Sequence, residues 1–286
     1  LVQPLYLKMH GLALAIERNV SAALEEDVGS GDLTAGLIPS DSRAAARIIT
    51  RNDAVVCGSA WVDACFRHLH ADTEIRWECS DGSRAEAGQT LCTLRGSARA
   101  LLTGERTALN FLQLLSGVAT NTRRYVDTVR GTRAKILDTR KTLPGLRIAQ
   151  KYAVATGGGV NHRMGLYDAV LIKENHVAAA GGVAAAMKTA LSAAPQGVWI
   201  QVEVETLDQL REAIDAGAKL ILLDNMNCAQ MREAVSVAAG RAELEASGGI
   251  TLDNVREIAE TGVDRISIGS LTKDIKAIDL SMRFEG

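Results

Sequence analysis

The stretch KLILLDNMNCAQMREAVSVAAGRAELEAS, residues 219–247, decides the fold. It begins and ends with short strand-like runs, KLILLD and AELEAS, and a helical pattern lies between them. The same alternation extends from about residue 134 to residue 269, with further strand-like runs at AKILD, DAVLI, VWIQVEV and DRISIG. Strands that alternate with helices at this spacing predict a parallel sheet. Six successive strands favour a closed or nearly closed α/β barrel.

A doubly wound sheet is the alternative arrangement for such a pattern. Its dinucleotide-binding form needs a GxGxxG motif after the first strand, and the sequence has none there. Before about residue 115 the pattern is mixed. We expect an amphipathic helix over about 9–26, strands at RAAARIIT, DAVVCG, TEIRWEC and QTLCTLRG, and a helix around WVDACFRHL. Together they predict an α+β domain ahead of the barrel.

Composition excludes several classes of protein. The chain has 286 residues, a net charge of −2 and 3% aromatic residues, which argues against a nucleic-acid surface. No apolar run approaches the roughly 20 residues that span a bilayer, and charges interrupt the weakly apolar N-terminal stretch, so we expect no signal peptide. Five cysteines without a CxxC motif fit reduced thiols better than disulfides or a zinc site. We therefore expect a soluble, cytoplasmic protein without nucleic-acid or membrane partners.

Polar or glycine residues follow each predicted barrel strand. The carboxyl ends of the strands carry the chemistry of α/β barrels, so we expect these residues to converge on one site. They are Asp138 to Lys141, Lys173 to His176, Glu203 and Glu205, Asp224 and Asn225, Ser247 to Gly249, and Gly269 and Ser270.

Cations dominate this predicted rim. Arg140, Lys141 and Lys173 follow strands, and we expect His162 and Arg163 to join them from the loop before the second strand. Such a cluster repels itself unless an anion is bound, and guanidinium groups suit carboxylate or phosphate. His162 fits a structural hydrogen-bonding role equally well.

The remaining rim residues indicate a phosphorylated ligand. Residues 247–249 (SGG) and 268–270 (IGS) each lie between a strand and a helix, where glycines let the backbone approach a phosphate. Glu203 and Asp224 supply carboxylates that suit Mg²⁺ or sugar hydroxyls. The rim therefore predicts a small molecule with several negative charges and a phosphorylated one.

The motifs in this chain resemble those of the quinolinate phosphoribosyltransferase family. They are LDTRKTLPGLR, GGGVNHRMGLYDAVLIKENH, VEVE, LLDNM, SGGI, ISIGSLTKDIKAIDLSMRF, LEEDVGSGDLT and ERTALNFLQLLSGVAT, and they cover nearly the whole chain. The resemblance implies that quinolinate and phosphoribosyl pyrophosphate become nicotinate mononucleotide, pyrophosphate and CO₂ in de novo NAD biosynthesis. It implies Mg²⁺ and no organic cofactor.

The resemblance also implies an architecture and an assembly. We expect an α+β open sandwich over residues 1–114, joined by the segment 271–286, and an incomplete parallel α/β barrel over residues 115–270. The family is homodimeric with shared active sites, and whether dimers assemble further into hexamers stays open.

Carried over residue by residue, the resemblance implies a set of site residues. The substrate-binding positions are Arg106 from the neighbouring subunit, Thr139, Arg140, Lys141, His162, Arg163, Lys173, Glu203, Asp224, Ser247, Gly248, Gly249, Ile268, Gly269 and Ser270. Lys141, Lys173, Glu203 and Asp224 are the catalytic positions among them. Glu203 and Asp224 are also the expected metal positions, either directly or through water or substrate. Family members often have alanine where Ser270 stands, which favours a role for its backbone.

Three other hypotheses can be compared with this one. A related phosphoribosyltransferase of the same fold could act on nicotinate or another anionic acceptor. A Schiff-base lyase using Lys173 predicts borohydride trapping of a carbonyl substrate, but it leaves the two phosphate-type loops unexplained. The stretch 81–96 (DGSRAEAGQTLCTLRG) resembles half of a biotinyl or lipoyl carrier domain, yet no modifiable lysine lies between Lys8 and Lys135, so the carrier hypothesis fails.

Overall fold

The computed structural model describes residues 9–285, which form two compact units. The first unit contains the chain up to Arg123, Thr142–Gly158 and the chain from Ser270 on, and the second contains Arg124–Lys141 and Gly159–Gly269. The sequence-based domain bounds at residues 114 and 270 stay a prediction, and their outermost parts, residues 1–8 and Gly286, lie outside the described residues.

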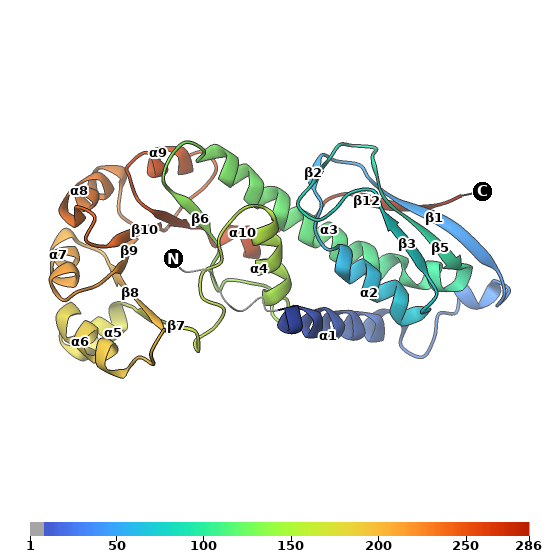
Figure 1. Ribbon diagram of the computed structural model, residues 1–286, viewed down its shortest axis with the longest axis horizontal. Helices are drawn as coiled ribbons and strands as arrows, with labels where there is room; N and C mark the ends of the chain where they lie inside the picture. Colours follow the sequence, from blue (N-terminus) through green and yellow to red (C-terminus); the bar gives the residue numbers. More distant parts are fainter. Residues whose placement is uncertain (1–8, 286) are drawn as a thin grey trace. The chain divides into compact units, whose positions relative to one another are not determined.

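The first unit is built around a four-stranded antiparallel sheet with strand order β12-β1-β5-β3 (Figure 1). β1 alternates buried residues such as Ala46 and Ile48 with exposed Arg47, as a strand with one covered face does. The strands are β1 (Arg43–Thr50), β2 (Ala54–Val55), β3 (Glu74–Trp77), β4 (Arg84–Ala85), β5 (Thr90–Ser97) and β12 (Leu280–Phe284). The helices are α1 (Met9–Val28), η1 (Ala35–Leu37), α2 (Ser59–Leu69), α3 (Ala98–Thr128), α4 (Arg147–Thr156) and α10 (Ser270–Lys273). The segment at the end of the chain thus returns to β1, where Ala46 pairs with Phe284.

The second unit is a six-stranded parallel sheet with strand order β6-β11-β10-β9-β8-β7. Its strands are β6 (Lys135–Leu137), β7 (Ala169–Ile172), β8 (Trp199–Val204), β9 (Leu220–Asp224), β10 (Glu243–Ser247) and β11 (Arg265–Ser267). Its helices are α5 (Glu174–Ala180), α6 (Val183–Ala193), α7 (Leu207–Asp215), α8 (Cys228–Ala238) and α9 (Val255–Ala259). The strands curve into a partial ring with these helices on the outside (Figure 1). Because the successive strands β6 and β7 are the two ends of the strand order, the barrel is incomplete, which confirms the predicted fold class.

Local sequence explains how the barrel strands lead into helices. Leu220, Ile221, Leu222 and Leu223 are all buried, as expected for a strand covered on both faces. The loop after β9 ends at Asn227, whose side chain accepts a hydrogen bond from the Gln230 N–H and so begins α8 with a capping box. The short polar loop after β9 is therefore fixed at both ends.

Two simpler expectations concern the cysteines and the membrane. The five cysteines are free thiols, and four of them are buried. None of the helices described between residues 9 and 285 has the length and apolarity that a membrane crossing requires.

Candidate active site

A cavity of about 400 Å³ opens at the carboxyl ends of the barrel strands in the second unit. It brings together eight of the predicted site residues, namely Thr139, Arg140, Lys141, His162, Arg163, Lys173, Glu203 and Ser247. Four further residues line it, namely Leu171, Leu222, Glu245 and Ser267. All twelve come from β6 to β11 or from the loops next to these strands.

The other predicted residues lie around this cavity or in the first unit. Asp224 pairs in register with Ser247, so it stands beside a lining residue without being one itself. Gly248 and Gly249 follow Ser247 in the chain, and Ile268 and Gly269 follow Ser267. In the first unit, Arg106 lies exposed on α3 and Ser270 is the first residue of α10. Glu205, also at a strand end, is exposed and does not line the cavity.

Neighbouring groups fix the Arg163 side chain and the backbone of Lys141. The Arg163 guanidinium donates through Nη1 to the Ala169 carbonyl at 3.1 Å, and the whole residue is 8% exposed. Burial lowers the pKa of Arg163, and the nearby positive charge of Arg140 lowers it further. The Lys141 N–H donates to Thr139 Oγ1 at 3.0 Å, which fixes the turn after β6. Concentrated positive charge of this kind favours an anionic ligand.

Glu203 and Asp224 form a carboxylate pair opposite these cations. Burial raises the pKa of Glu203, the charge of Asp224 raises it further, and Lys173 opposes the shift. Two neighbouring carboxylates that repel one another suit a cation bound near both. Within residues 9–285, no group of three or more His, Cys, Asp or Glu side chains is arranged to hold a metal ion. The pair therefore fits an ion that shares its coordination with substrate oxygens or water, and it does not form a complete protein site.

Two glycines of the rim, Gly248 and Gly269, stand where a Cβ would meet neighbouring side chains closely. Gly248 has φ +101°, and a Cβ at this position would lie 2.0 Å from Asn225 Oδ1. The Asn225 amide in turn donates to Asp224 Oδ2 at 2.9 Å. A Cβ at Gly269 would lie 2.9 Å from Lys141 Cδ. These glycines let the loop after β10 approach Asn225, which hydrogen-bonds to Asp224, and the loop after β11 approach the Lys141 side chain.

A buried polar network below the rim is absent from the sequence-based prediction. His162 Nε2 lies 2.9 Å from Gln201 Oε1, and the Gln201 amide donates to Glu245 Oε2 at 3.0 Å. Gln201 and Glu245 are each 1% exposed. Strand alternation could have indicated these residues from the sequence. Gln201 stands two residues before Glu203, and Glu245 stands two residues before Ser247, so the members of each pair share a face of their strand. Only the strand ends were considered, so these inner positions were missed.

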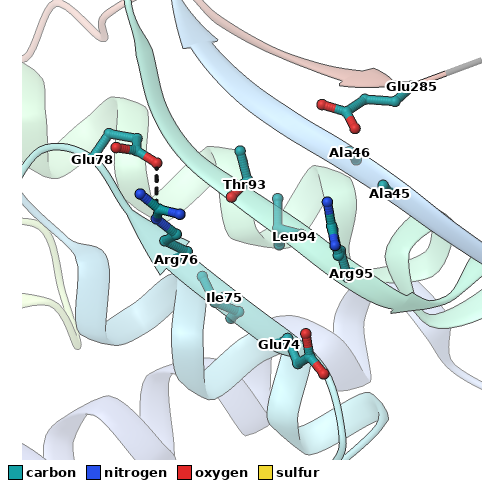
Figure 2. A pocket seen from close by; sticks show the side chains of 10 residues that line it. All are labelled: Ala45, Ala46, Glu74, Ile75, Arg76, Glu78, Thr93, Leu94, Arg95 and Glu285. Carbon is teal, nitrogen blue, oxygen red and sulfur yellow. Dashed lines mark ion pairs between the residues drawn. The ribbon is translucent and has the colours of Figure 1, made fainter.

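A second cavity, of about 380 Å³, lies on the sheet of the first unit (Figure 2). Its charged lining is mixed, since Glu74, Glu78 and Glu285 accompany Arg76 and Arg95. Arg76 pairs with Glu78 at 3.3 Å, as the dashed line in Figure 2 shows. Because three carboxylates accompany only two guanidinium groups, this cavity lacks the excess of cations that distinguishes the barrel cavity.

Comparison with known proteins agrees with this geometry. Residues 32–116 match the family model described as "Quinolinate phosphoribosyl transferase, N-terminal domain". Residues 118–283 match the model described as "Quinolinate phosphoribosyl transferase, C-terminal domain". The two matches together span most of the chain.

Similar proteins include one curated relative and two solved structures with high identity. The nicotinate-nucleotide pyrophosphorylase [carboxylating] of Mycobacterium leprae is 42% identical, over 94% of this chain and 96% of the relative. The structure of the nicotinate-nucleotide pyrophosphorylase from Francisella tularensis has a TM-score of 0.93 and 44% identity, covering 96% of this chain and 97% of that one. The structure of NadC from Streptococcus pyogenes has a TM-score of 0.92 and 39% identity, covering 94% and 96%.

Proposed function

Because the chain belongs to the quinolinate phosphoribosyltransferase family, we propose that it converts quinolinate and phosphoribosyl pyrophosphate into nicotinate mononucleotide, pyrophosphate and CO₂. The observation that carries the proposal is the cavity at the barrel rim, where Arg140, Lys141, Arg163 and Lys173 gather around one space. A dicarboxylate and a pyrophosphate ester are the kinds of ligand that such a cluster stabilises.

The proposed substrate positions follow from the chemistry of the lining. Quinolinate carboxylates lie among Arg140, Arg163 and Lys173, since guanidinium groups bind carboxylates through paired hydrogen bonds. The phosphate groups of the donor lie along residues 247–249 and 268–270, whose glycines carry no side chain to cover the backbone N–H groups. Thr139, His162 and Ser247 complete the lining between them.

The first chemical step is the transfer of the phosphoribosyl group. The quinolinate ring nitrogen attacks ribose C1, the bond from C1 to the pyrophosphate oxygen breaks, and positive charge develops on the ribose. Glu203 and Asp224 stabilise this charge as fixed carboxylates, and Lys141 and Lys173 stabilise the negative charge of the leaving group. Holding both substrates in one orientation supplies a further part of the rate enhancement.

Decarboxylation follows from the product of the first step. The ring nitrogen is now cationic, and its positive charge stabilises the electron pair that stays on the adjacent ring carbon when the bond to the carboxyl carbon breaks and CO₂ leaves. The ring carbon then takes a proton. This chain needs only to hold the nucleotide and to exclude water from the transient carbanion, without a covalent nucleophile or an organic cofactor.

Mg²⁺ is the proposed metal ion of the reaction. The residues that would meet it are Glu203 and Asp224, whose mutual repulsion raises the pKa of Glu203 beyond the effect of burial alone. When bound with the donor, the ion would neutralise part of the diphosphate charge.

The proposed assembly is a homodimer in which Arg106 of one subunit completes the cavity of the other. Its support is the exposed position of Arg106 on α3 and the family of the chain. Further assembly into hexamers is a second possibility within this proposal. A cytoplasmic location is proposed from the five free cysteines, since thiols persist in reducing compartments.

A substrate comparison tests the proposed function. Purified protein with Mg²⁺ and phosphoribosyl pyrophosphate should release pyrophosphate with quinolinate and far more slowly with nicotinate, which carries only one carboxylate. Faster release with nicotinate would assign the chain to another acceptor within the same fold.

A further inference from the structure

Both ring nitrogens of His162 are engaged inside the second unit. The Arg163 backbone N–H donates to His162 Nδ1 at 2.8 Å, so Nδ1 carries a lone pair. In a neutral imidazole the single ring proton must then lie on Nε2. Nε2 is 2.9 Å from Gln201 Oε1, which accepts this proton in a hydrogen bond. The backbone contact therefore selects one tautomer.

Glu245 fixes the orientation of the Gln201 amide. Gln201 Nε2 donates to Glu245 Oε2 at 3.0 Å, and a carboxylate can only accept, so Gln201 Oε1 must face His162. Both side chains are 1% exposed, which excludes bulk water as a substitute partner. The second carboxylate oxygen, Glu245 Oε1, is buried, has no hydrogen-bond partner within residues 9–285, and lies 3.7 Å from His162 Nε2. The donor directions thus run from His162 to Gln201 and from Gln201 to Glu245.

The surroundings of His162 decide between a neutral and a charged ring. The Glu245 carboxylate from β10 favours a second ring proton, but that proton would have to lie on Nδ1, opposite the Arg163 N–H. The backbone cannot easily move away, because the His162 N–H donates to Asp138 Oδ1 at 2.8 Å at the end of β6. The Trp199 ring on β8 lies nearly perpendicular to the imidazole ring, with 5.1 Å between the ring centroids, and it adds no charge. A neutral ring satisfies these contacts, whereas an imidazolium breaks one of them.

We propose that Gln201 and Glu245 are positioning residues that hold His162 as its neutral Nε2–H tautomer and, through His162 Nδ1, hold the backbone of Arg163 at the cavity. His162 thereby lines the cavity as a neutral ring in a fixed orientation. The cationic side chains of the lining are Arg140, Lys141, Arg163 and Lys173. The placement of Arg163 against a carboxylate of quinolinate rests on the function proposed above, whereas the tautomer does not.

The tautomer can be measured directly on the ligand-free protein. The chain has five histidines, so ¹⁵N-labelled histidine gives few ring signals, and the signal lost in His162→Gln identifies His162. At neutral pH we expect Nε2 to carry the only ring proton. In Gln201→Leu we expect the single tautomer to give way to a mixture. Gln150→Leu is the matched control, because Gln150 is also fully buried but belongs to the first unit, and it should leave the His162 signal unchanged.

A swap of the two side chains separates positioning from general stability. Gln201→Glu alone sets two carboxylates about one hydrogen bond apart. Gln201→Glu together with Glu245→Gln again places a donor opposite an acceptor at both contacts, with the hydrogen bond between positions 201 and 245 reversed and an acceptor still facing His162 Nε2. We expect Gln201→Leu to raise KM for quinolinate about tenfold with a smaller effect on kcat, and the swap to recover most of this loss together with the Nε2–H tautomer.

Each outcome decides one of the two proposals. An imidazolium or an Nδ1–H tautomer in the unaltered protein overturns the positioning role, and so does an unchanged His162 signal in Gln201→Leu. Absence of quinolinate turnover in the unaltered protein overturns the proposed function and leaves the tautomer result standing.

Discussion

The contact between Gly248 and Asn225 predicts how a methyl group added at position 248 changes stability. Gly248 has φ +101°, and the Cβ of alanine at this position would lie 2.0 Å from Asn225 Oδ1 and 2.8 Å from its Cγ. An L-residue with a left-handed backbone costs about 1–2 kcal/mol. The Asn225 side chain must also move, which breaks its hydrogen bond to Asp224 Oδ2, worth about 1 kcal/mol. Gly248→Ala should therefore lower the free energy of unfolding by about 2–3 kcal/mol.

The same substitution should also lower activity, because Asp224 belongs to the proposed catalytic pair. Loss of about 1.4 kcal/mol of transition-state stabilisation lowers kcat/KM tenfold, and we expect at least about this effect with quinolinate. Thermal unfolding and steady-state kinetics measure the two effects separately.

Gly217→Ala is the matched control for this prediction. Gly217 also has a positive φ, +88°, but a Cβ there would meet nothing within 4 Å, and the residue follows α7 away from the cavity. It should show the backbone cost alone, about 1–2 kcal/mol, with full activity. Equal stability losses in both variants, together with normal activity of Gly248→Ala, would refute the reasoning.

Three further predictions concern the charged residues. Arg140→Ala and Lys173→Ala should each lower kcat/KM by about one to two orders of magnitude while circular dichroism shows a normal fold, since hydrogen bonds to charged groups contribute about 1.5–3 kcal/mol each; normal turnover in either variant would contradict their placement. Mixed dimers of Arg106→Ala and Lys173→Ala subunits should regain activity through one intact shared site, and properly formed but inactive mixed dimers would exclude a cross-subunit Arg106. Burial and the charge of Asp224 raise the pKa of Glu203. As the pH is lowered, Glu203 therefore becomes protonated at a higher pH than an ordinary glutamate does. The acidic limb of kcat/KM should therefore move to lower pH in Asp224→Asn, and an unmoved limb would show that Glu203 does not control it.

The barrel could be predicted from the sequence because its signals are local. Runs such as LILL, bounded by polar loops and amphipathic helices, specify buried parallel strands without knowledge of their neighbours. The strand ends were informative for the same reason, since Lys173 directly follows an apolar run and Arg140 stands three residues after Leu137. The family motifs then indicated that the residues at these separate strand ends belong to one binding site.

The buried network was beyond this kind of inference. Gln201 and Glu245 stand within strands, where one polar residue can face solvent or the barrel interior with the same alternation. Their partnership depends on β8 and β10 being separated by only β9, which is a property of strand order. Similarly, the need for glycine at position 248 arises from Asn225 on the preceding loop, 23 residues earlier in the chain. Contacts of this kind require the folded barrel.

The most direct test of the central claim is the fate of the carboxyl group next to the ring nitrogen of quinolinate. Quinolinate labelled with ¹⁴C at this carboxyl is incubated with the protein, phosphoribosyl pyrophosphate and Mg²⁺, and labelled CO₂, pyrophosphate and nicotinate mononucleotide are quantified. We expect the three products to form in equal amounts and none of them to form without the donor. Pyrophosphate release without labelled CO₂, or no reaction of quinolinate at all, would contradict the proposed reaction.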